Sequence, residues 1–150
     1  MVAYQRETLT DAFIAEVEPL LREHFASMKF YEGYEYEADW ASYRFLEGLD
    51  QLFVFTAREE GVLIGYAAFA VHQNMHCKAM RHAIQDLVFI TPEGRKGFAG
   101  YSLLKFADAY LKEAGVNRVT HYTPAKDGFG PLLTRMGYEM TEHTYSKRLQ

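Results

Sequence analysis

The sequence has a single cysteine, Cys77, among its 150 residues. One cysteine excludes a disulfide within the chain and a zinc site built from several cysteines, and it favours a reducing compartment. Long apolar runs are also missing, because the longest extends only from Val62 to Val71, well short of the roughly 20 residues that a membrane helix needs. The first residues lack the apolar core of a signal peptide. These absences predict a soluble, cytoplasmic protein.

A strong charge of one sign is missing from the whole chain, whose net charge is −4, but the two halves differ. Residues 1–75 contain 5 Lys or Arg and 13 Asp or Glu, a balance of −8, whereas residues 76–150 contain 11 and 7, a balance of +4. We expect the halves to meet different ligands, unless the division arose by chance. The basic residues form no stripe, which disfavours nucleic acid as a partner.

The length and an apolar content of 49% are typical of one domain, residues 1–150. Hydrophobic spacing and turn residues predict the order β-α-α-β-β-β-α-β-α-β. This order indicates an α/β (α+β) fold with a mixed, mostly antiparallel central sheet and helices on both faces. The expected elements are strands at Val2–Arg6, Gln51–Ala57, Val62–His72, His82–Thr91, Val116–Tyr122 and Tyr138–Leu149, and helices at Thr10–Phe25, Asp39–Asp50, Gly97–Ala114 and Pro131–Met136.

The ends and interiors of the two N-terminal helices carry specific signals. Thr10 or Asp11 is expected to cap the first helix and Asp39 the second, since their side chains accept from free backbone N–H groups. Pro19 lies inside the first helix, where it removes a hydrogen bond. We therefore expect a kink or two shorter helices there.

The segment from Asp86 to Leu104 is the most informative. A strand leads into a turn rich in glycine and basic residues, and this turn opens a helix. The N-terminus of a helix has unpaired N–H groups and a partial positive charge, so it suits phosphate or pyrophosphate, and Arg95 and Lys96 add charge. A P-loop is absent, and the spacing of the glycines after an antiparallel meander fits a dinucleotide fold poorly.

These residues resemble the motif of the GCN5-related N-acetyltransferase (GNAT) family, Gln/Arg-x-x-Gly-x-Gly/Ala at the start of a helix. Arg95 begins the match and Gly100 completes it, whereas Phe98 stands at the middle glycine. The sequence LVFITPEGRKG is similar to the family's fourth strand and loop, and LLTRMGYEMTEHTYSKRL is similar to its last helix and final strand. A looser likeness is to phage- and prophage-encoded members.

The resemblance implies an N-acetyltransferase that moves an acetyl group from acetyl-CoA to a primary amine by direct attack in a ternary complex, without a metal. In the family the fourth strand splays from the fifth, and the pantetheine arm lies between them. By position, backbone groups of Leu87, Val88 and Phe89 would pair with that arm. The residues that would hold the pyrophosphate are Arg95, Lys96, Gly97, Phe98, Ala99 and Gly100.

Asp86 is the candidate general base, because family members often place an acid on this strand. Alternation puts it on one face with Val88 and Ile90, where a carboxylate must be solvated, paired or functional; a hydrogen bond to a neighbouring loop is the alternative. The family often uses a Tyr as general acid four residues before the final Gly-aromatic pair, but Leu133 stands there. Tyr122 is the candidate replacement, with packing on the sheet as the alternative.

Histidines near the third strand are further candidates for moving protons, since histidine titrates near neutrality. His76 is the first choice, and His72 and His121 are others; for each, an ordinary surface or loop position is the alternative. A metal site at His72, His76 and Cys77 is rejected, because the segment is not helical and a third clear ligand is missing.

The loop between the first two helices borders the acceptor in this family. Here it contains Glu32, Tyr34 and Glu35 among further acids and aromatics, and both kinds of side chain attract ammonium groups. We predict that the acceptor is a cationic amine, either a small molecule or a lysine or N-terminal amine of a peptide. The alternative is that these residues form a solvated loop that binds no acceptor.

A non-catalytic GNAT-fold protein that binds CoA or a partner stays open as a second function. The exposed final strand could pair with another subunit, so a homodimer is an option.

Overall fold

The computed structural model describes residues 1–150, and a five-stranded sheet in the order β1-β2-β3-β4-β5 forms its centre. β1 to β4 are antiparallel neighbours, and β5 pairs with β4 in parallel. The predicted mixed, mostly antiparallel sheet is therefore confirmed. The strands are β1 (Val2–Glu7), β2 (Leu52–Glu59), β3 (Val62–Gln73), β4 (Arg81–Ile90) and β5 (Arg118–Thr120).

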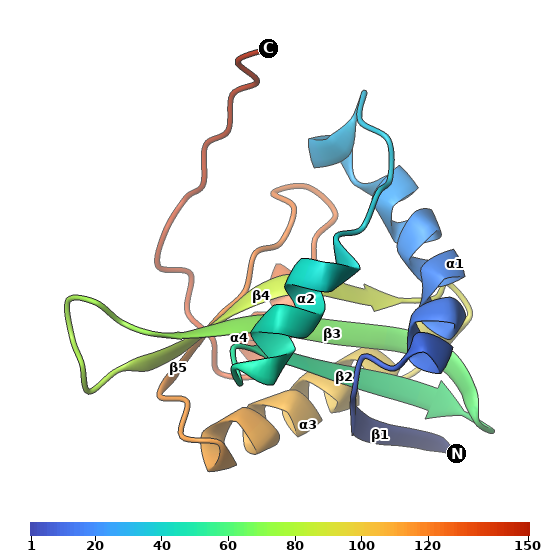
Figure 1. The fold of residues 1–150 in the computed structure, drawn as a ribbon, viewed down its shortest axis with the longest axis horizontal. Coiled ribbons are helices and arrows are strands. Elements are labelled where there is room, and N and C mark those ends of the chain that lie inside the picture. Colours follow the sequence, from blue (N-terminus) through green and yellow to red (C-terminus); the bar gives the residue numbers. More distant parts are fainter.

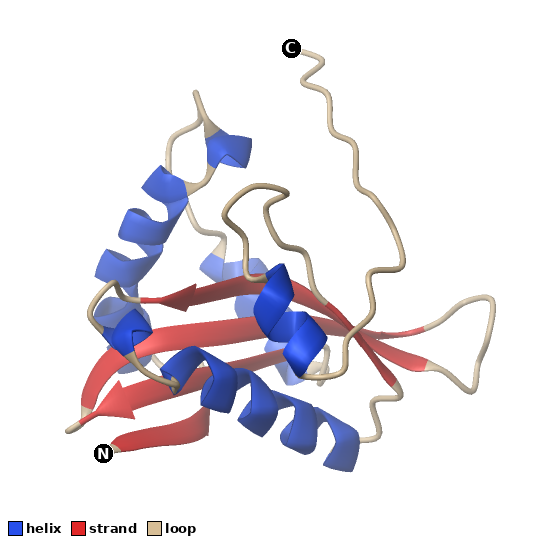
Figure 2. Ribbon diagram, turned by 180° about the vertical axis from the view of Figure 1, so that it is seen from behind, coloured by secondary structure: helices blue, strands red, loops and turns tan.

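Helices cover both faces of the sheet, as predicted (Figures 1 and 2). α1 and α2 lie on one face and α3 and α4 on the other, and each pair encloses its own apolar core. β2 serves both cores, because alternate residues point to opposite faces: Phe53 and Phe55 pack on the α3 side, and Val54 on the α1 side. The helices are α1 (Asp11–Ser27), α2 (Trp40–Gly48), α3 (Ala99–Glu113) and α4 (Gly130–Arg135), with 3₁₀ turns η1 (Lys29–Tyr31) and η2 (Gly94–Lys96). No helix has both the length and the apolar character that a membrane crossing requires.

The start of α1 and of α2 follows the capping signals. The side chain of Thr10 accepts from the N–H of Phe13 at 3.1 Å, and Asp39 accepts from the N–H of Ser42 at 3.0 Å. Of the two outcomes expected at Pro19, a kink or two shorter helices, the second does not occur, because α1 runs through the proline as one helix. The buried residues of α1 lie on both sides of the proline, so packing against the sheet holds the two halves together at the cost of one backbone hydrogen bond.

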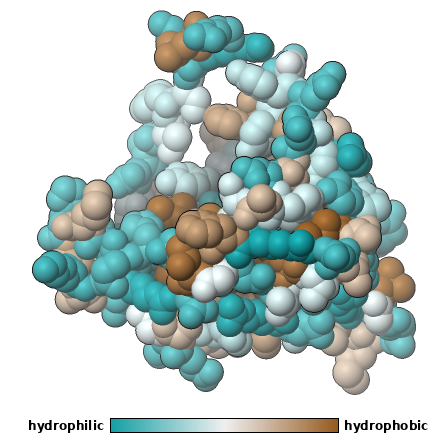
Figure 3. Space-filling model, viewed as in Figure 1, coloured by the Kyte–Doolittle hydropathy of each residue, from teal (hydrophilic) through white to brown (hydrophobic).

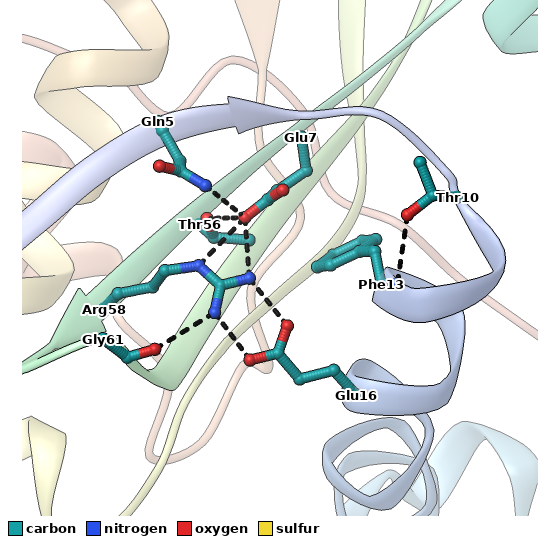
Figure 4. A network of polar contacts seen from close by, with 8 residues as sticks. All are labelled: Gln5, Glu7, Thr10, Phe13, Glu16, Thr56, Arg58 and Gly61. Atoms are coloured by element: carbon teal, nitrogen blue, oxygen red, sulfur yellow. Dashed lines mark hydrogen bonds and ion pairs between the residues drawn. The ribbon is translucent and has the colours of Figure 1, made fainter.

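An ion-pair network ties the edge strand β1 to α1 (Figure 4). The guanidinium of Arg58 lies between two carboxylates, at 2.9 Å from Glu7 of β1 and 2.6 Å from Glu16 of α1. The hydroxyl of Thr56 also donates to Glu7, at 2.8 Å. The side chains of Arg58 and Glu7 are only 16% and 12% exposed, so the network is shielded from solvent on its inner side.

The C-terminal segment differs most from the sequence prediction. Residues 139–150 form no helix or strand, so the strand predicted at Tyr138–Leu149 is wrong for the single chain. A strand requires a neighbour for its backbone groups, and no backbone group beyond Tyr138 bonds to the backbone of another segment. β5 is also shorter than predicted, at Arg118–Thr120.

Candidate active site at the separation of β4 and β5

β4 loses one of its two neighbours halfway along its length. The parallel pairing with β5 covers only the steps from His82↔Arg118 to Ile84↔Thr120, whereas β4 pairs with β3 as far as Ile90. At the point of separation, the side chain of Gln85 donates to the carbonyl of Tyr122 at 3.1 Å. Beyond it, the backbone edge of β4 faces no strand, so it can accept an extended ligand.

The loop after β4 ends in an uncapped helix N-terminus. α3 begins at Ala99 with no side-chain cap, and the N–H groups of Gly97 and Phe98 make no hydrogen bond within the chain. Phe98, at the position of the family's middle glycine, has a φ of −97°, which any residue adopts, and its side chain is 82% exposed. Arg95 folds back to donate to the carbonyl of Ile90 at 2.8 Å, and Lys96 is exposed. This set of donors and positive charges fits a pyrophosphate.

A β-bulge places Asp86 on the α1 side of the sheet. The register between β3 and β4 shifts after Ala68↔Leu87 to Phe69↔Gln85, so Asp86 has no partner on β3. Asp86 and Leu87 consequently both face the α1 side, whereas Val88 packs on the α3 side. The prediction that Asp86 shares a face with Val88 and Ile90 is therefore wrong, because one extra residue in a strand reverses its alternation.

Asp86 lies in a large pocket of about 1130 Å³. The sheet forms its floor, and α1, residues 28–39, α2 and the C-terminal residues 146–148 form its walls. Figure 3 shows the hollow between the C-terminal segment and the loop after α1. The loop residues predicted to meet the acceptor, Glu32, Tyr34 and Glu35, all line this pocket.

The carboxyl of Asp86 is held by Tyr43 of α2. The hydroxyl of Tyr43 donates to Asp86 Oδ2 at 2.7 Å, while the carboxyl stays accessible from the pocket. The protein atoms around it remove water and raise the pKa of Asp86, and the hydrogen bond from Tyr43 opposes this rise. Burial and the charge of Asp86 raise the pKa of Tyr43, so Tyr43 stays a donor. The result is a carboxylate that binds a proton more readily than an ordinary aspartate.

A second polar pair, His24 and Tyr66, lies in the same pocket and was missed by the sequence analysis. His24 Nδ1 and the hydroxyl of Tyr66 share a hydrogen bond of 2.7 Å, and the imidazole stacks on Phe89 of β4 at 4.8 Å. Burial, with a smaller contribution from Arg95, lowers the pKa of His24 to about 4, so it is neutral at pH 7. The sequence feature that could have identified His24 is its helical spacing, because it follows the buried residues Val17 and Leu21 on the same face of α1.

The structure does not bring the other two predicted catalytic residues into this pocket. Tyr122 lies at the separation of β4 and β5, outside the pocket, with its side chain 50% exposed. His76 is in the exposed turn between β3 and β4, at the opposite end of β4 from η2. Leu133 is buried in the core of the α3 side, so no acid stands in the family's usual place. No group of three His, Cys, Asp or Glu residues could hold a metal ion.

Comparison with known proteins decides the family. The model of the acetyltransferase (GNAT) family matches residues 14–138. The chain belongs to the GNAT acetyltransferase family. Acetyltransferases of this family use acetyl-CoA. The looser likeness to phage- and prophage-encoded members stays a prediction.

Solved structures share the fold at low sequence identity. An aminoglycoside acetyltransferase from an uncultured soil metagenomic sample, in complex with sisomicin, has a TM-score of 0.77 and 14% identity, with 99% of this chain and 97% of that chain covered. Ribosomal-protein-alanine N-acetyltransferase from Brucella melitensis biovar Abortus 2308 has a TM-score of 0.75 and 18% identity, with both chains covered to 100%. A predicted acetyltransferase with acetyl-CoA from Clostridium acetobutylicum has a TM-score of 0.69 and 18% identity, with 99% and 97% covered. No curated protein matches the GNAT domain in sequence.

Proposed function

We propose that the chain transfers an acetyl group from acetyl-CoA to a primary amine held in the large pocket, with Asp86 as general base. The position of Asp86 carries this proposal. Its carboxyl opens into the pocket, and the β4 bulge that holds it lies directly beyond the last residue of β4 that pairs with β5. An amine in the pocket and a thioester along the open edge of β4 would meet beside this carboxyl.

Acetyl-CoA would be held by backbone groups more than by side chains. The free N–H groups of Gly97 and Phe98, with those of Ala99 and Gly100 in the first turn of α3, would bind the pyrophosphate. Arg95 and Lys96 would add charge. Leu87, Val88 and Phe89 would offer their backbone to the pantetheine arm, because this part of β4 has no neighbour on the β5 side.

The chemistry requires a base because an alkyl amine, with a pKa near ~10, is protonated at pH 7. Asp86 would take that proton directly or through a water, and Tyr43 would keep its carboxyl in place. The free amine would attack the thioester carbonyl, and a backbone N–H would stabilise the oxyanion. As the C–S bond breaks, Tyr122 would supply a proton to the departing thiolate, and the proton that the attacking nitrogen must lose to become an amide would return to Tyr122.

The acceptor would be a cationic amine. Glu32, Glu35 and Tyr34 line the pocket, and the ring of Tyr34 already binds a cation of the chain itself, the guanidinium of Arg148 at 4.9 Å. A cation–π contact of this kind is available to an ammonium group. The names of two fold relatives, which specify aminoglycosides and a ribosomal-protein alanine, also refer to amine acceptors.

A non-catalytic protein that binds CoA is the second candidate. Leu133, buried at the place of the family's usual acid, favours this function, because the leaving thiolate then lacks its normal proton donor. The two functions share the binding of acetyl-CoA and differ in turnover.

Release of CoA in the presence of an amine panel tests the proposal. We expect turnover with polyamines, aminoglycosides or lysine peptides and little with neutral or anionic amines. Turnover confined to anionic amines would overturn the cationic acceptor, and calorimetric binding of acetyl-CoA with no turnover on any amine would favour the second function.

The double variant Glu32→Gln/Glu35→Gln should raise KM for a cationic amine about tenfold, roughly 1.4 kcal/mol, without changing the affinity for acetyl-CoA. The control Glu59→Gln/Glu113→Gln removes the same charge at exposed positions outside the pocket and should leave KM unchanged.

A further inference from the structure

The imidazole of His24 is held against the floor of the large pocket. Its Nδ1 shares a hydrogen bond of 2.7 Å with the hydroxyl of Tyr66, and its ring stacks on Phe89 with 23° between the two planes. The other ring nitrogen, Nε2, has no hydrogen-bond partner in the protein, and unlike Nε2 of His121 it is not sealed from solvent. Because His24 lines the pocket, this nitrogen is presented to a ligand there.

The hydrogen bond with Tyr66 decides which nitrogen of His24 carries the proton. Tyr66 is only 2% exposed and its hydroxyl has no other partner, so its proton is bonded only if it is donated to Nδ1. Nδ1 then has no proton of its own, and the ring is neutral. This agrees with the pKa of His24, which burial and, to a smaller extent, Arg95 lower to about 4. The remaining N–H of the ring is therefore at Nε2, as an unused donor in the pocket.

A donor at this position requires an acceptor atom on the ligand. An ammonium group has no lone pair to offer, and an anion is disfavoured because five carboxylates line the pocket against three basic side chains. A carbonyl oxygen can only accept, so the carboxylates offer it nothing. A hydroxyl can accept from Nε2–H and donate to a carboxylate at the same time. The carboxylates are those of Glu32, Glu35, Glu37, Asp39 and Asp86.

The apolar part of the lining suits a ligand of the same kind. Five aromatic side chains from residues 31–43 line the pocket: Tyr31, Tyr34, Tyr36, Trp40 and Tyr43. A hydroxylated ring has an apolar face of C–H groups, which packs on aromatic side chains, and a polar edge, which needs a few well-placed hydrogen-bonding groups. The pocket offers both surfaces.

We propose that the acceptor is a hydroxylated amine, such as an amino sugar or an aminocyclitol, and that Nε2–H of His24 binds one of its hydroxyl oxygens. Tyr66 acts through His24 as a positioning residue, because it fixes the ring and its tautomer. The inference rests on the amine site of the proposed function and extends it. The carboxylates of the pocket respond to the charge of an amine, whereas His24 distinguishes amines of equal charge.

Two amines with the same ring test this preference in the wild-type protein. Diaminocyclohexane and deoxystreptamine share a six-membered carbon ring and two amino groups, and only deoxystreptamine has hydroxyls. We expect KM for deoxystreptamine to be about fivefold lower, as one added hydrogen bond predicts. Equal KM values would overturn the proposal. So would a lower KM for a lysine peptide than for deoxystreptamine, because the oxygen at His24 would then be a carbonyl.

Two substitutions of His24 separate its two nitrogens. The amide of Gln reaches the position of Nε2, whereas the amide oxygen of Asn lies near that of Nδ1 and can still accept from Tyr66. His24→Gln should keep the preference for deoxystreptamine, and His24→Asn should abolish it. Tyr66→Phe should weaken it, since the ring of His24 is then no longer fixed. In all three variants the affinity for acetyl-CoA should stay within about twofold of the wild type, because a merely structural role would alter both ligands. A preference kept by His24→Asn would overturn the proposal.

Calorimetric binding of the two amines distinguishes a failure of this inference from a failure of the proposed function. Tighter binding of deoxystreptamine without acetylation of either amine would overturn the enzymatic function and support the role of His24. Acetylation of both amines with equal affinities would support the function and overturn the role of His24. Binding of neither amine would overturn both.

Discussion

Two aspartate–tyrosine pairs on opposite faces of the sheet are chemically almost identical. Tyr43 donates to Asp86 at 2.7 Å on the α1 side, and Tyr138 donates to Asp108 at 2.6 Å on the α3 side. In both, removal from water raises the pKa of the carboxyl, and the tyrosine opposes the rise. They differ in their position in the fold. Asp86 opens into the large pocket where β4 and β5 separate, whereas Asp108 joins α3 to Tyr138, three residues beyond the end of α4. A shifted aspartate pKa therefore does not by itself identify a catalytic group.

The largest expected difference between the two pairs is in kcat, when each aspartate is replaced in turn. Asp86→Asn keeps the shape and the contact with Tyr43 but cannot take a proton, so kcat should fall by about 10²–10⁴-fold. Asp108→Asn should leave kcat within about twofold, since it touches neither the pocket nor the open edge of β4. Steady-state kinetics of CoA release provide the measurement. Equal losses in the two variants would contradict the assignment.

The pH profile of the wild type sharpens the same comparison. Asp86 must be ionised to act, and its pKa is raised from the ordinary value of 3.8. The rate should therefore fall on the acid side at a pH above that of an ordinary aspartate, and Asp86→Asn should lose this limb while Asp108→Asn keeps it.

Substitution of Arg58 tests whether every polar cluster on the α1 side of the sheet contributes to catalysis or whether some contribute only to stability. Arg58→Met should lower the free energy of unfolding by about 1–3 kcal/mol, because Glu7 keeps a shielded carboxylate without its ion pair. The network lies outside the pocket, so kcat should not change.

The stability contributed by this network should depend on pH. Arg58 lowers the pKa of Glu16 below 4.5, so the stabilisation by the Arg58–Glu16 ion pair is present above pH 4.5 and is lost as the pH falls through the lowered value. Urea unfolding of both proteins at pH 7 and pH 3 should show the difference shrinking in acid.

A comparison variant is Arg44→Met, which breaks an exposed pair with Asp11, 44% and 96% exposed, together with one hydrogen bond to the carbonyl of Leu9. Exposed pairs contribute at most about 1 kcal/mol. A loss at Arg44 as large as that at Arg58 would show that shielding of the ion pair does not matter here.

The smallest expected effect concerns stability, where the two aspartate pairs should behave alike. A carboxyl with a raised pKa in the folded state contributes most stability when protonated, below 3.8, and loses it as the pH rises through the folded value. At pH 7 both Asp86→Asn and Asp108→Asn should therefore melt slightly above the wild type, and the gain should vanish near pH 3. Thermal unfolding at the two pH values provides the measurement. A gain in only one variant would mean that the two carboxyls are not equally deprived of water.

Sequence periodicity was sufficient for most of the fold, because the determining interactions are local or repetitive. The caps at Thr10 and Asp39 need only neighbouring residues, and the strands β2 and β3 need only their turn at residues 59–61. Pro19 does not divide α1 into two helices, because tertiary packing of α1 outweighs the loss of one backbone hydrogen bond. The final strand depends on a neighbour that one sequence does not specify.

The candidate site was harder to foresee than the fold. The choice of Asp86 came from its family position, but its face of the sheet could not be read from alternation, because the bulge is set by the pairing of β3 with β4. His24 and Tyr66 meet across 42 positions of the sequence, and nothing local to either residue signals the other. His76 was chosen for its residue type alone and lies away from the pocket, because a histidine in a polar turn of the sequence carries no information about its distance from a pocket.

The pairing of β1 with β2 has a consequence for the order in which the chain folds. Val2 lies opposite Glu59 and Glu7 opposite Val54, so this pairing closes a long loop that contains α1, η1 and α2, the walls of the large pocket. Closing a long loop costs entropy before its contacts form, and such non-local pairings slow folding. By contrast, β2, β3 and β4 follow one another and can assemble as a meander. We expect the sheet to nucleate there, and the pocket to be among the last parts of the chain to acquire its shape after synthesis.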